Sequence, residues 1–135
     1  MVSLILIFIG TFWEVSMDII GMKHNYDQSL WKLLADYFDR KNIKIFGNQF
    51  WDNSIAWKNK WKNHNPLDGE AFFGSSTFFV PVTDGWHLTK LIWLMHILSA
   101  VILFERISNY LIIDLIIYYI VFGIGHEVFR YLLLK

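Results

Sequence analysis

Several acidic and histidine side chains lie within or beside the long apolar runs of this sequence. They are Glu14, Asp18, Asp84, His87, His126 and Glu127. Ionisable groups inside an apolar run of membrane length are costly, so they are functional candidates by default. Carboxylates and imidazoles suit Zn, Mn or Fe, and the chain has no cysteine that would supply thiolate ligands. These residue types predict a site for a divalent metal.

The predicted site divides these side chains into metal ligands and bases. The expected ligands are Asp18, Asp84, His87 and His126. A catalytic metal lowers the pKa of its bound water toward about 7, and the hydroxide so formed can attack an ester or a phosphoester. Glu14 or Glu127 would act as the catalytic general base. No HExxH motif occurs, so the spacing alone does not specify the site.

Structural ion pairing is the alternative fate of the same charges, and it is the usual one inside membranes. The expected pairs are Glu127 with Arg130, Glu14 or Asp18 with Lys90, and His87 with Asp84. Two further polar residues lie away from the cluster. We expect His96 to be hydrogen-bonded within the helix bundle, and Asp114 to pair with Arg106 or a tyrosine.

Three apolar runs must position these side chains. The chain of 135 residues is 55% hydrophobic, which is too apolar for a small soluble domain. Residues 2–22, 86–104 and 110–134 are each long enough to cross a hydrocarbon core of about 30 Å as a helix. We therefore predict an all-α membrane protein with three transmembrane helices. The short turn between the second and third spans predicts an antiparallel helical hairpin.

Lys and Arg fall mainly on one side of these spans. The segment between the first two spans contains Lys23, Lys32, Arg40, Lys41, Lys44, Lys58, Lys60 and Lys62. Positive residues near span ends are retained in the cytoplasm. We therefore predict a multi-pass protein of the cell inner membrane, with the N-terminus outside and the C-terminus in the cytoplasm. This topology brings the acidic and histidine side chains of all three spans to the same cytoplasmic side at a similar depth.

Residues 23–85 form the predicted interfacial, partly helical cytoplasmic segment of this single membrane domain. Within it, residues 30–38 place Leu30, Trp31, Leu34, Tyr37 and Phe38 on one helical face. The same pattern fits a helix lying on the bilayer and a helix packed in a soluble subdomain. Asp27 or Ser29 would cap its start.

Tryptophan and lysine alternate in residues 51–62 (WDNSIAWKNKWK). Trp57 and Trp61 are four residues apart and would stack on one face of a helix. Indole rings favour the headgroup layer and lysines attract anionic lipid, so the segment is either an interfacial anchor or a binding site for a phosphate-bearing substrate. The expected substrate-binding residues are Trp57, Lys58, Lys60, Trp61, Lys62 and Arg130. Zero net charge and three spans argue against nucleic acid as a partner.

Residues 72–82 form a fourth apolar piece, which is too short to span a membrane as a helix and contains Pro81. Its hydroxyls in the GSST string lack the spacing and the lysine of a phosphate loop. We expect them to start a helix or to satisfy backbone groups near the membrane.

Two strings, residues 54–61 (SIAWKNKW) and 74–88 (GSSTFFVPVTDGWHL), resemble segments of a group of small uncharacterised multi-span bacterial membrane proteins. That group pairs an SWKNKW-like string with a GSSTxFVxxTDxWHL-like one. This chain departs from the pattern because Ile55 and Ala56 intervene before Trp57. The resemblance implies a membrane location and draws attention to Asp84 and His87, but it supplies no mechanism.

Three functions remain open on this basis. The first is a metal-dependent hydrolase or transferase that acts on a lipid or lipid-linked substrate at the cytoplasmic face. The second is a non-enzymatic small assembly or pore-forming subunit, whose buried charges form ion pairs within a homo-oligomer. The third is an electron-transfer subunit with haem held by His96 and either His87 or His126, although no motif marks these histidines out. In each case the lipid bilayer and its anionic headgroups are the expected partners.

Overall fold

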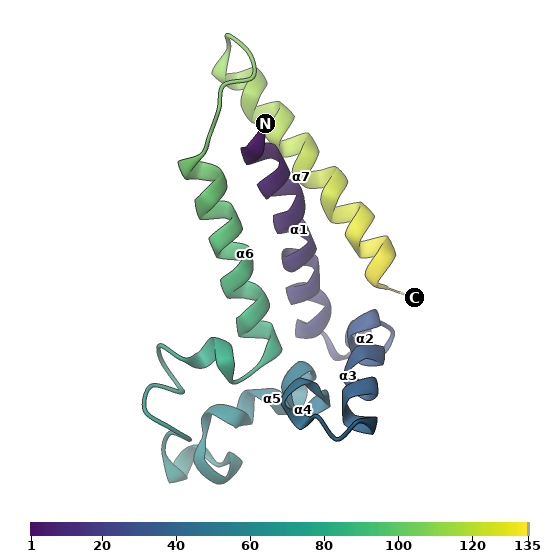
Figure 1. Ribbon diagram of the computed structural model, residues 1–135, viewed down its shortest axis with the longest axis vertical. Coiled ribbons are helices and arrows are strands. Elements are labelled where there is room, and N and C mark those ends of the chain that lie inside the picture. The colour runs from purple at the N-terminus through teal and green to yellow at the C-terminus, as the bar shows by residue number, and fades with distance from the viewer. Residues whose placement is uncertain (135) are drawn as a thin grey trace.

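Three long helices dominate the computed structural model, which describes residues 1–134 (Figure 1). They are α1 (Val2–Gly21), α6 (Gly85–Ile102) and α7 (Leu111–Leu133). Each is long and apolar enough to cross a membrane. The predicted all-α fold with three candidate spans is therefore confirmed, and the helix ends lie within two residues of the expected positions.

Short helices fill the segment between α1 and α6, so the expected partly helical segment is also confirmed. They are α2 (Lys23–Asp27), α3 (Leu30–Arg40), η1 (Lys44–Phe46), α4 (Asn48–Trp51), α5 (Asn53–Ala56), η2 (Trp57–Lys60), η3 (Lys62–His64), η4 (Pro66–Asp68) and η5 (Val80–Val82). Ser29 caps α3, because its side-chain oxygen accepts a hydrogen bond from the Lys32 amide at 3.3 Å.

The first helix lies between the other two and packs against both (Figure 1). The short turn makes α6 and α7 antiparallel, as expected, and the two helices diverge on opposite sides of α1. Small residues allow α1 to approach both α6 and α7 closely. A Cβ atom at Gly10 would lie 3.2 Å from the Cβ of His96 on α6, and one at Gly125 on α7 would lie 3.1 Å from the Phe8 ring.

The hydrophobic core lies where the lower half of α1 meets the short helices and the end of α7. It consists of Val15, Ile19, Ile20, Tyr26, Trp31, Ala35, Phe50, Trp51 and Leu133. The Trp31 and Trp51 rings stack with centroids 4.5 Å apart. A backbone bridge between Ser29 and Leu134 places the end of α7 beside the start of α3. The interhelical segment and the end of α7 therefore share one end of the molecule.

Helix α3 combines the two environments that its sequence allowed. Trp31 and Ala35 are buried in the core, whereas Leu30, Leu34 and Tyr37 remain exposed. One edge of the apolar face thus packs on protein and the other is free to contact the bilayer surface.

An ion pair joins the start of α2 to Asp52, which lies between α4 and α5. The Lys23 ammonium contacts the carboxylates of Asp52 and, at 3.0 Å, Asp27. Burial raises the pKa of Asp52, but hydrogen bonds from Lys23 and Ser54 outweigh it and hold the pKa below its ordinary value. Asp52 is therefore charged and paired at neutral pH.

Polar groups at the opposite end of the molecule are paired as predicted. The Arg106 guanidinium donates to buried Asp114 at 2.5 Å, and the Ser108 amide donates to the same carboxylate at 2.7 Å. Within the bundle, the His96 ring bonds to the Ile92 carbonyl oxygen at 2.8 Å. Both expectations for these residues are confirmed.

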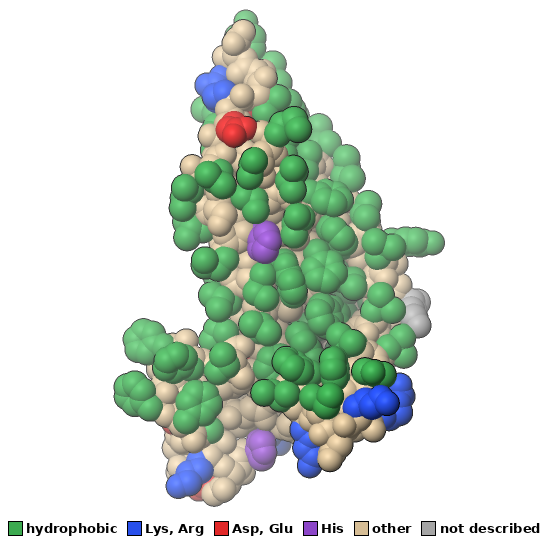
Figure 2. All heavy atoms as spheres, in the orientation of Figure 1, with side chains coloured by type: hydrophobic (Ala, Val, Ile, Leu, Met, Phe, Trp, Pro, Cys, Tyr) green, Lys and Arg blue, Asp and Glu red, His purple; other side chains and the backbone are tan. Residues whose placement is uncertain are grey.

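Apolar side chains cover most of the visible surface along the long helices (Figure 2). Most residues in the apolar windows of α6 and α7 are not buried by protein. Lipid is the environment that would cover them, so the structure indicates a multi-pass membrane protein.

Candidate metal site

Three of the predicted site residues converge where α1 and α7 lie side by side. Glu14 and Asp18 are four residues apart and share one face of α1, and His126 faces them from α7. One ligand atom from each residue lies within 4.8 Å of the other two. The His126 Nε2 atom is 3.8 Å from Glu14 Oε2. Two carboxylates and one imidazole thus form a compact group from helices at opposite ends of the sequence.

The neighbouring Gly125 explains why His126 can approach α1. The backbone of α7 packs here on Thr11 and Phe8, and a side chain at Gly125 would hold the two helices apart. Gly125 therefore allows the close contact between α1 and α7. The other glycine, Gly123, has no atom within 4 Å of its Cβ position and leaves a gap instead.

The spacing of the three ligand atoms suits a metal ion after small side-chain adjustments. Ligands of a tetrahedral Zn²⁺ at about 2.1 Å lie roughly 3.4 Å apart. The observed 3.8 Å between Glu14 and His126 is close to that value. The Glu14 Oε2 atom is buried and accepts no hydrogen bond from any residue between 1 and 134. A buried acceptor without a partner is costly, and a bound cation would satisfy it.

The other ring nitrogen of His126 faces a carboxylate as well. Its Nδ1 atom lies 3.3 Å from Oε1 of Glu127, whose side chain is mostly exposed. A proton on Nδ1 would donate to Glu127 and leave the Nε2 lone pair facing Glu14 and Asp18. Carboxylates commonly orient metal-binding histidines in this way. The geometry therefore fits Glu127 better as an orienting residue than as a base.

Two cavities open beside the group. The first has a volume of about 220 Å³, and its polar lining comes from Asp18, Asn25, His126 and Arg130. Arg130 lines the same cavity as two of the three ligands. Asn25 could not be predicted as a lining residue from the sequence, because it lies on the short helix α2 outside any span.

The second cavity is an open groove of about 530 Å³ along α7. Glu14, His126 and Glu127 line its polar end, and the rest of its lining is Tyr119, Ile120, Phe122, Gly123 and Ile124. The groove includes Gly123, where no side chain fills the space. Its apolar part on α7 is therefore continuous with the polar end formed by Glu14, His126 and Glu127.

Asp84 and His87, which we predicted as ligands, form a separate pair at the start of α6. Buried Asp84 caps the helix by accepting from the His87 amide at 2.9 Å, and both its oxygens lie 2.8 Å from the His87 Nδ1 atom. Among the described residues, neither joins the group of Glu14, Asp18 and His126. This is the pairing that the ion-pair hypothesis expected for His87.

The other two expected ion pairs do not form within residues 1–134. Glu127 contacts His126 rather than Arg130. Lys90 lies over the Trp86 ring, with its Nζ atom 4.9 Å from the ring centroid, and does not contact Glu14 or Asp18. The α1 carboxylates of Glu14 and Asp18 therefore lie beside His126 rather than beside Lys90.

The segment of tryptophans and lysines differs from the expected helix. Helix η2 ends at Lys60 and Trp61 is extended, so Trp57 and Trp61 do not stack on one helical face. Each ring instead has a lysine over it, Lys58 over Trp57 and Lys60 over Trp61. In both pairs the lysine Nζ atom lies 5.7 Å from the ring centroid. None of these residues, nor Lys62, lines either cavity at the group, whereas Arg130 lines the first.

The two strings that carry the family resemblance contact each other in the structure. The Asn59 side chain donates to the Thr83 carbonyl oxygen at 2.8 Å, and the Ser75 hydroxyl donates to the Lys60 carbonyl oxygen at 2.8 Å. The Ser75 and Thr77 hydroxyls of the GSST string therefore satisfy backbone carbonyl groups, which was one of the two expected roles, whereas the Ser76 hydroxyl donates to the Glu70 side chain.

Comparisons with known proteins add no family to this picture. No protein-family model matches the sequence, and searches of curated proteins and of solved structures find no match.

Proposed function

We propose that this chain is an integral membrane protein that binds a divalent metal ion through Glu14, Asp18 and His126. We further propose that it acts as a hydrolase or transferase on a lipid or lipid-linked ester or phosphate. The observation that supports the proposal most directly is the convergence of three ligand atoms within 4.8 Å between α1 and α7. Zn, Mn and Fe are the metals that match this set of oxygen and nitrogen donors.

The charges of the group favour a bound dication. Two carboxylates and a neutral imidazole compensate a charge of +2, and such compensation matters most where water is scarce. Three protein ligands leave a coordination position for water, as catalytic zinc sites do. Asp18 and His126 also line the cavity that contains Arg130, so this position would have a guanidinium nearby.

The surroundings of the group favour a phosphate-bearing lipid as the substrate. A guanidinium binds phosphate oxygens through paired hydrogen bonds, and Arg130 lines the cavity that Asp18 and His126 also line. The apolar groove along α7 would accept an acyl or prenyl chain from the bilayer. Hydrolysis would place hydroxide on phosphorus, break the bond to the alcohol oxygen and return a proton to the leaving alcohol.

The orientation of the site belongs to the same proposal. We place the site on the cytoplasmic side of the cell inner membrane, because most Lys and Arg residues lie in the segment at that end of the molecule. A lipid substrate would then enter from the cytoplasmic leaflet.

Metal analysis tests the proposal. The protein is purified in detergent without chelators, loaded with Zn²⁺, Mn²⁺ or Fe²⁺, dialysed and analysed by mass spectrometry for metal per chain. We expect stoichiometric metal in the wild type and its loss in Asp18→Asn and His126→Gln. His87→Gln is the matched control, because His87 lies outside the group, and it should retain the metal. Substoichiometric metal in the wild type, or unchanged metal in both ligand variants, would exclude the site.

Structural pairing remains the second candidate function, since His126 lies between Glu14 and Glu127. A protonated imidazole would neutralise a carboxylate there without any metal, as in a small membrane assembly subunit. This alternative predicts a metal-free wild type whose thermal stability in detergent falls in His126→Gln. A metal-loaded wild type with the same loss of metal and stability in His126→Gln supports the enzyme proposal instead.

A further inference from the structure

A group of aromatic side chains protrudes from the segment just before α6. Residues 71–82 expose Phe72, Phe73, Phe78, Phe79 and Val82. Phe73 and Phe78 are 88% and 85% exposed, which is unusual for phenylalanine in any folded chain. Figure 2 shows hydrophobic side chains protruding at the lower left, beside the base of α6 and above charged side chains. A patch of this kind marks an interaction surface.

Hydrogen bonds hold this aromatic loop in a defined shape although it is neither a long helix nor a strand. The Glu70 carboxylate accepts from the amides of Gly74 at 2.9 Å and Ser76 at 3.1 Å, and also from the Ser76 hydroxyl. The Phe79 amide donates to the Gly74 carbonyl oxygen at 2.9 Å. Because Glu70 satisfies the amides of the turn, the loop can enter a less polar medium with fewer unpaired backbone groups.

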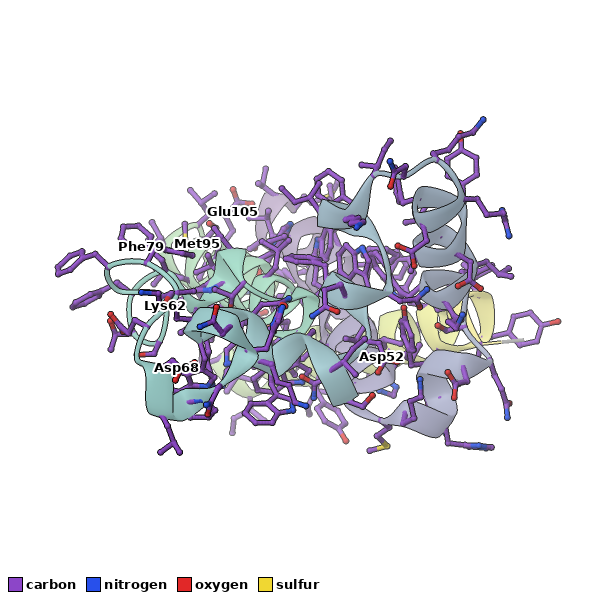
Figure 3. The ribbon with its side chains drawn as sticks, turned by 90° about the horizontal axis from the view of Figure 1, so that it is seen from below. Asp52, Lys62, Asp68, Phe79, Met95 and Glu105 are labelled. Carbon is purple, nitrogen blue, oxygen red and sulfur yellow. The ribbon has the colours of Figure 1, made fainter. Side chains whose placement is uncertain are left out.

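The aromatic loop and the lysine segment form one hydrogen-bonded unit. The Lys62 amide donates to the Gly69 carbonyl oxygen at 2.9 Å, and the Ala71 amide donates to the Lys60 carbonyl oxygen at 3.0 Å. In the view from below, Lys62, Asp68 and Phe79 project from the same edge of the molecule, away from Asp52 near its middle (Figure 3). Phenylalanines and lysines are therefore presented together.

We propose that residues 71–82 insert into the leaflet of the phospholipid bilayer that borders the lower end of α6. Helix η5 runs into α6 across Thr83 and Asp84, so the aromatic loop continues the lipid-facing surface of a candidate span. Lys58, Lys60 and Lys62 lie in the adjoining segment, where they would meet anionic headgroups. This combination of apolar protrusion and adjoining lysines matches a membrane surface, and it is independent of the proposed metal site.

A depth measurement tests the insertion. The chain has no cysteine, so single cysteines at Phe73→Cys and Phe78→Cys carry the environment-sensitive dye NBD without further changes. Both side chains are exposed, and their replacement removes no core contact. The full chain is reconstituted in vesicles of phosphatidylcholine and phosphatidylglycerol. We expect blue-shifted emission at both positions and quenching by lipids that carry a nitroxide on the acyl chain.

Leu67→Cys is the matched control, because Leu67 is 93% exposed in the neighbouring turn at η4, outside the aromatic loop. We expect the dye there to emit as in water and to be quenched several-fold less by the acyl nitroxide. Equal quenching at positions 67 and 78 would overturn the proposal. So would blue-shifted emission at 73 and 78 without quenching by lipid, since a protein partner would then cover the loop. The metal content of these cysteine variants should equal that of the wild type. The test of membrane insertion is then independent of the test of the proposed metal site.

Discussion

Replacement of Gly125 by alanine tests the helix contact on which the proposed site depends. A Cβ atom there would lie 3.1 Å from the Phe8 ring and 3.3 Å from the Thr11 Cβ atom, and closer still to the Thr11 hydroxyl. Carbon atoms pack comfortably at about 3.5–4.0 Å, so α7 must move away from α1 by roughly 0.5 Å or more. Overpacking of this kind costs about 1–3 kcal/mol of unfolding free energy.

Gly123→Ala isolates this packing cost. Both glycines lie in α7, so both substitutions gain a similar helix propensity of up to about 1 kcal/mol. No atom lies within 4 Å of the Cβ position at Gly123, so only Gly125→Ala carries the steric cost. Unfolding in mixed micelles with increasing dodecyl sulfate, followed by circular dichroism, should therefore show Gly125→Ala less stable than Gly123→Ala by about 1–3 kcal/mol.

The same pair of variants reports on the site. Movement of α7 lengthens the 3.8 Å separation between His126 and Glu14, so metal affinity should fall about tenfold in Gly125→Ala, which corresponds to roughly 1.4 kcal/mol. Gly123→Ala should bind metal as the wild type does. Equal stability and equal affinity in the two variants would refute the close contact between α1 and α7.

Three further outcomes follow from the fold. Burial raises the pKa of Asp52, but its hydrogen bonds with Lys23 and Ser54 lower it more. Its contribution to stability is therefore present above its unfolded pKa of about 3.9 and is lost as pH falls through the lower folded pKa, so unfolding midpoints between about pH 5 and pH 2 should depend less on pH in Asp52→Asn. Gly85→Ala should destabilise the protein by about 1–3 kcal/mol and weaken its near-ultraviolet dichroism, since a Cβ atom would lie 2.7 Å from a carbon of the Trp51 ring. A cysteine at position 109 should react with an impermeant reagent only from outside the cell, and labelling only from the cytoplasm would reverse the proposed orientation.

Much of the fold could be predicted because its signals are local. Span length and apolarity located the three long helices to within two residues. Capping chemistry limited the start of α3 to Asp27 or Ser29, of which Ser29 is the cap, and the apolar pattern of residues 30–38 located the helix itself. The apolar pattern did not show that Trp31 and Ala35 form the buried edge of α3. The Trp31 ring packs on Trp51, which comes from a segment without helical periodicity.

The site was only partly predictable, because depth in the membrane does not determine rotation about a helix axis. Glu14 and Asp18 share a face by their spacing alone, and His126 was expected at the same depth. Asp84 was expected there too, but the amides at the start of α6 take its carboxylate as a cap. The short turn after α6 fixed the direction of α7, yet nothing in it indicated that α1 would lie between the two.

The central position of α1 has a consequence for how the protein is made. Of the three long helices, α1 is synthesised first and α7 last, so Glu14 and Asp18 precede His126. Until α7 docks, the first span carries two acids without their histidine, which is costly in the bilayer. Docking of α7 on α1 therefore completes the group of Glu14, Asp18 and His126.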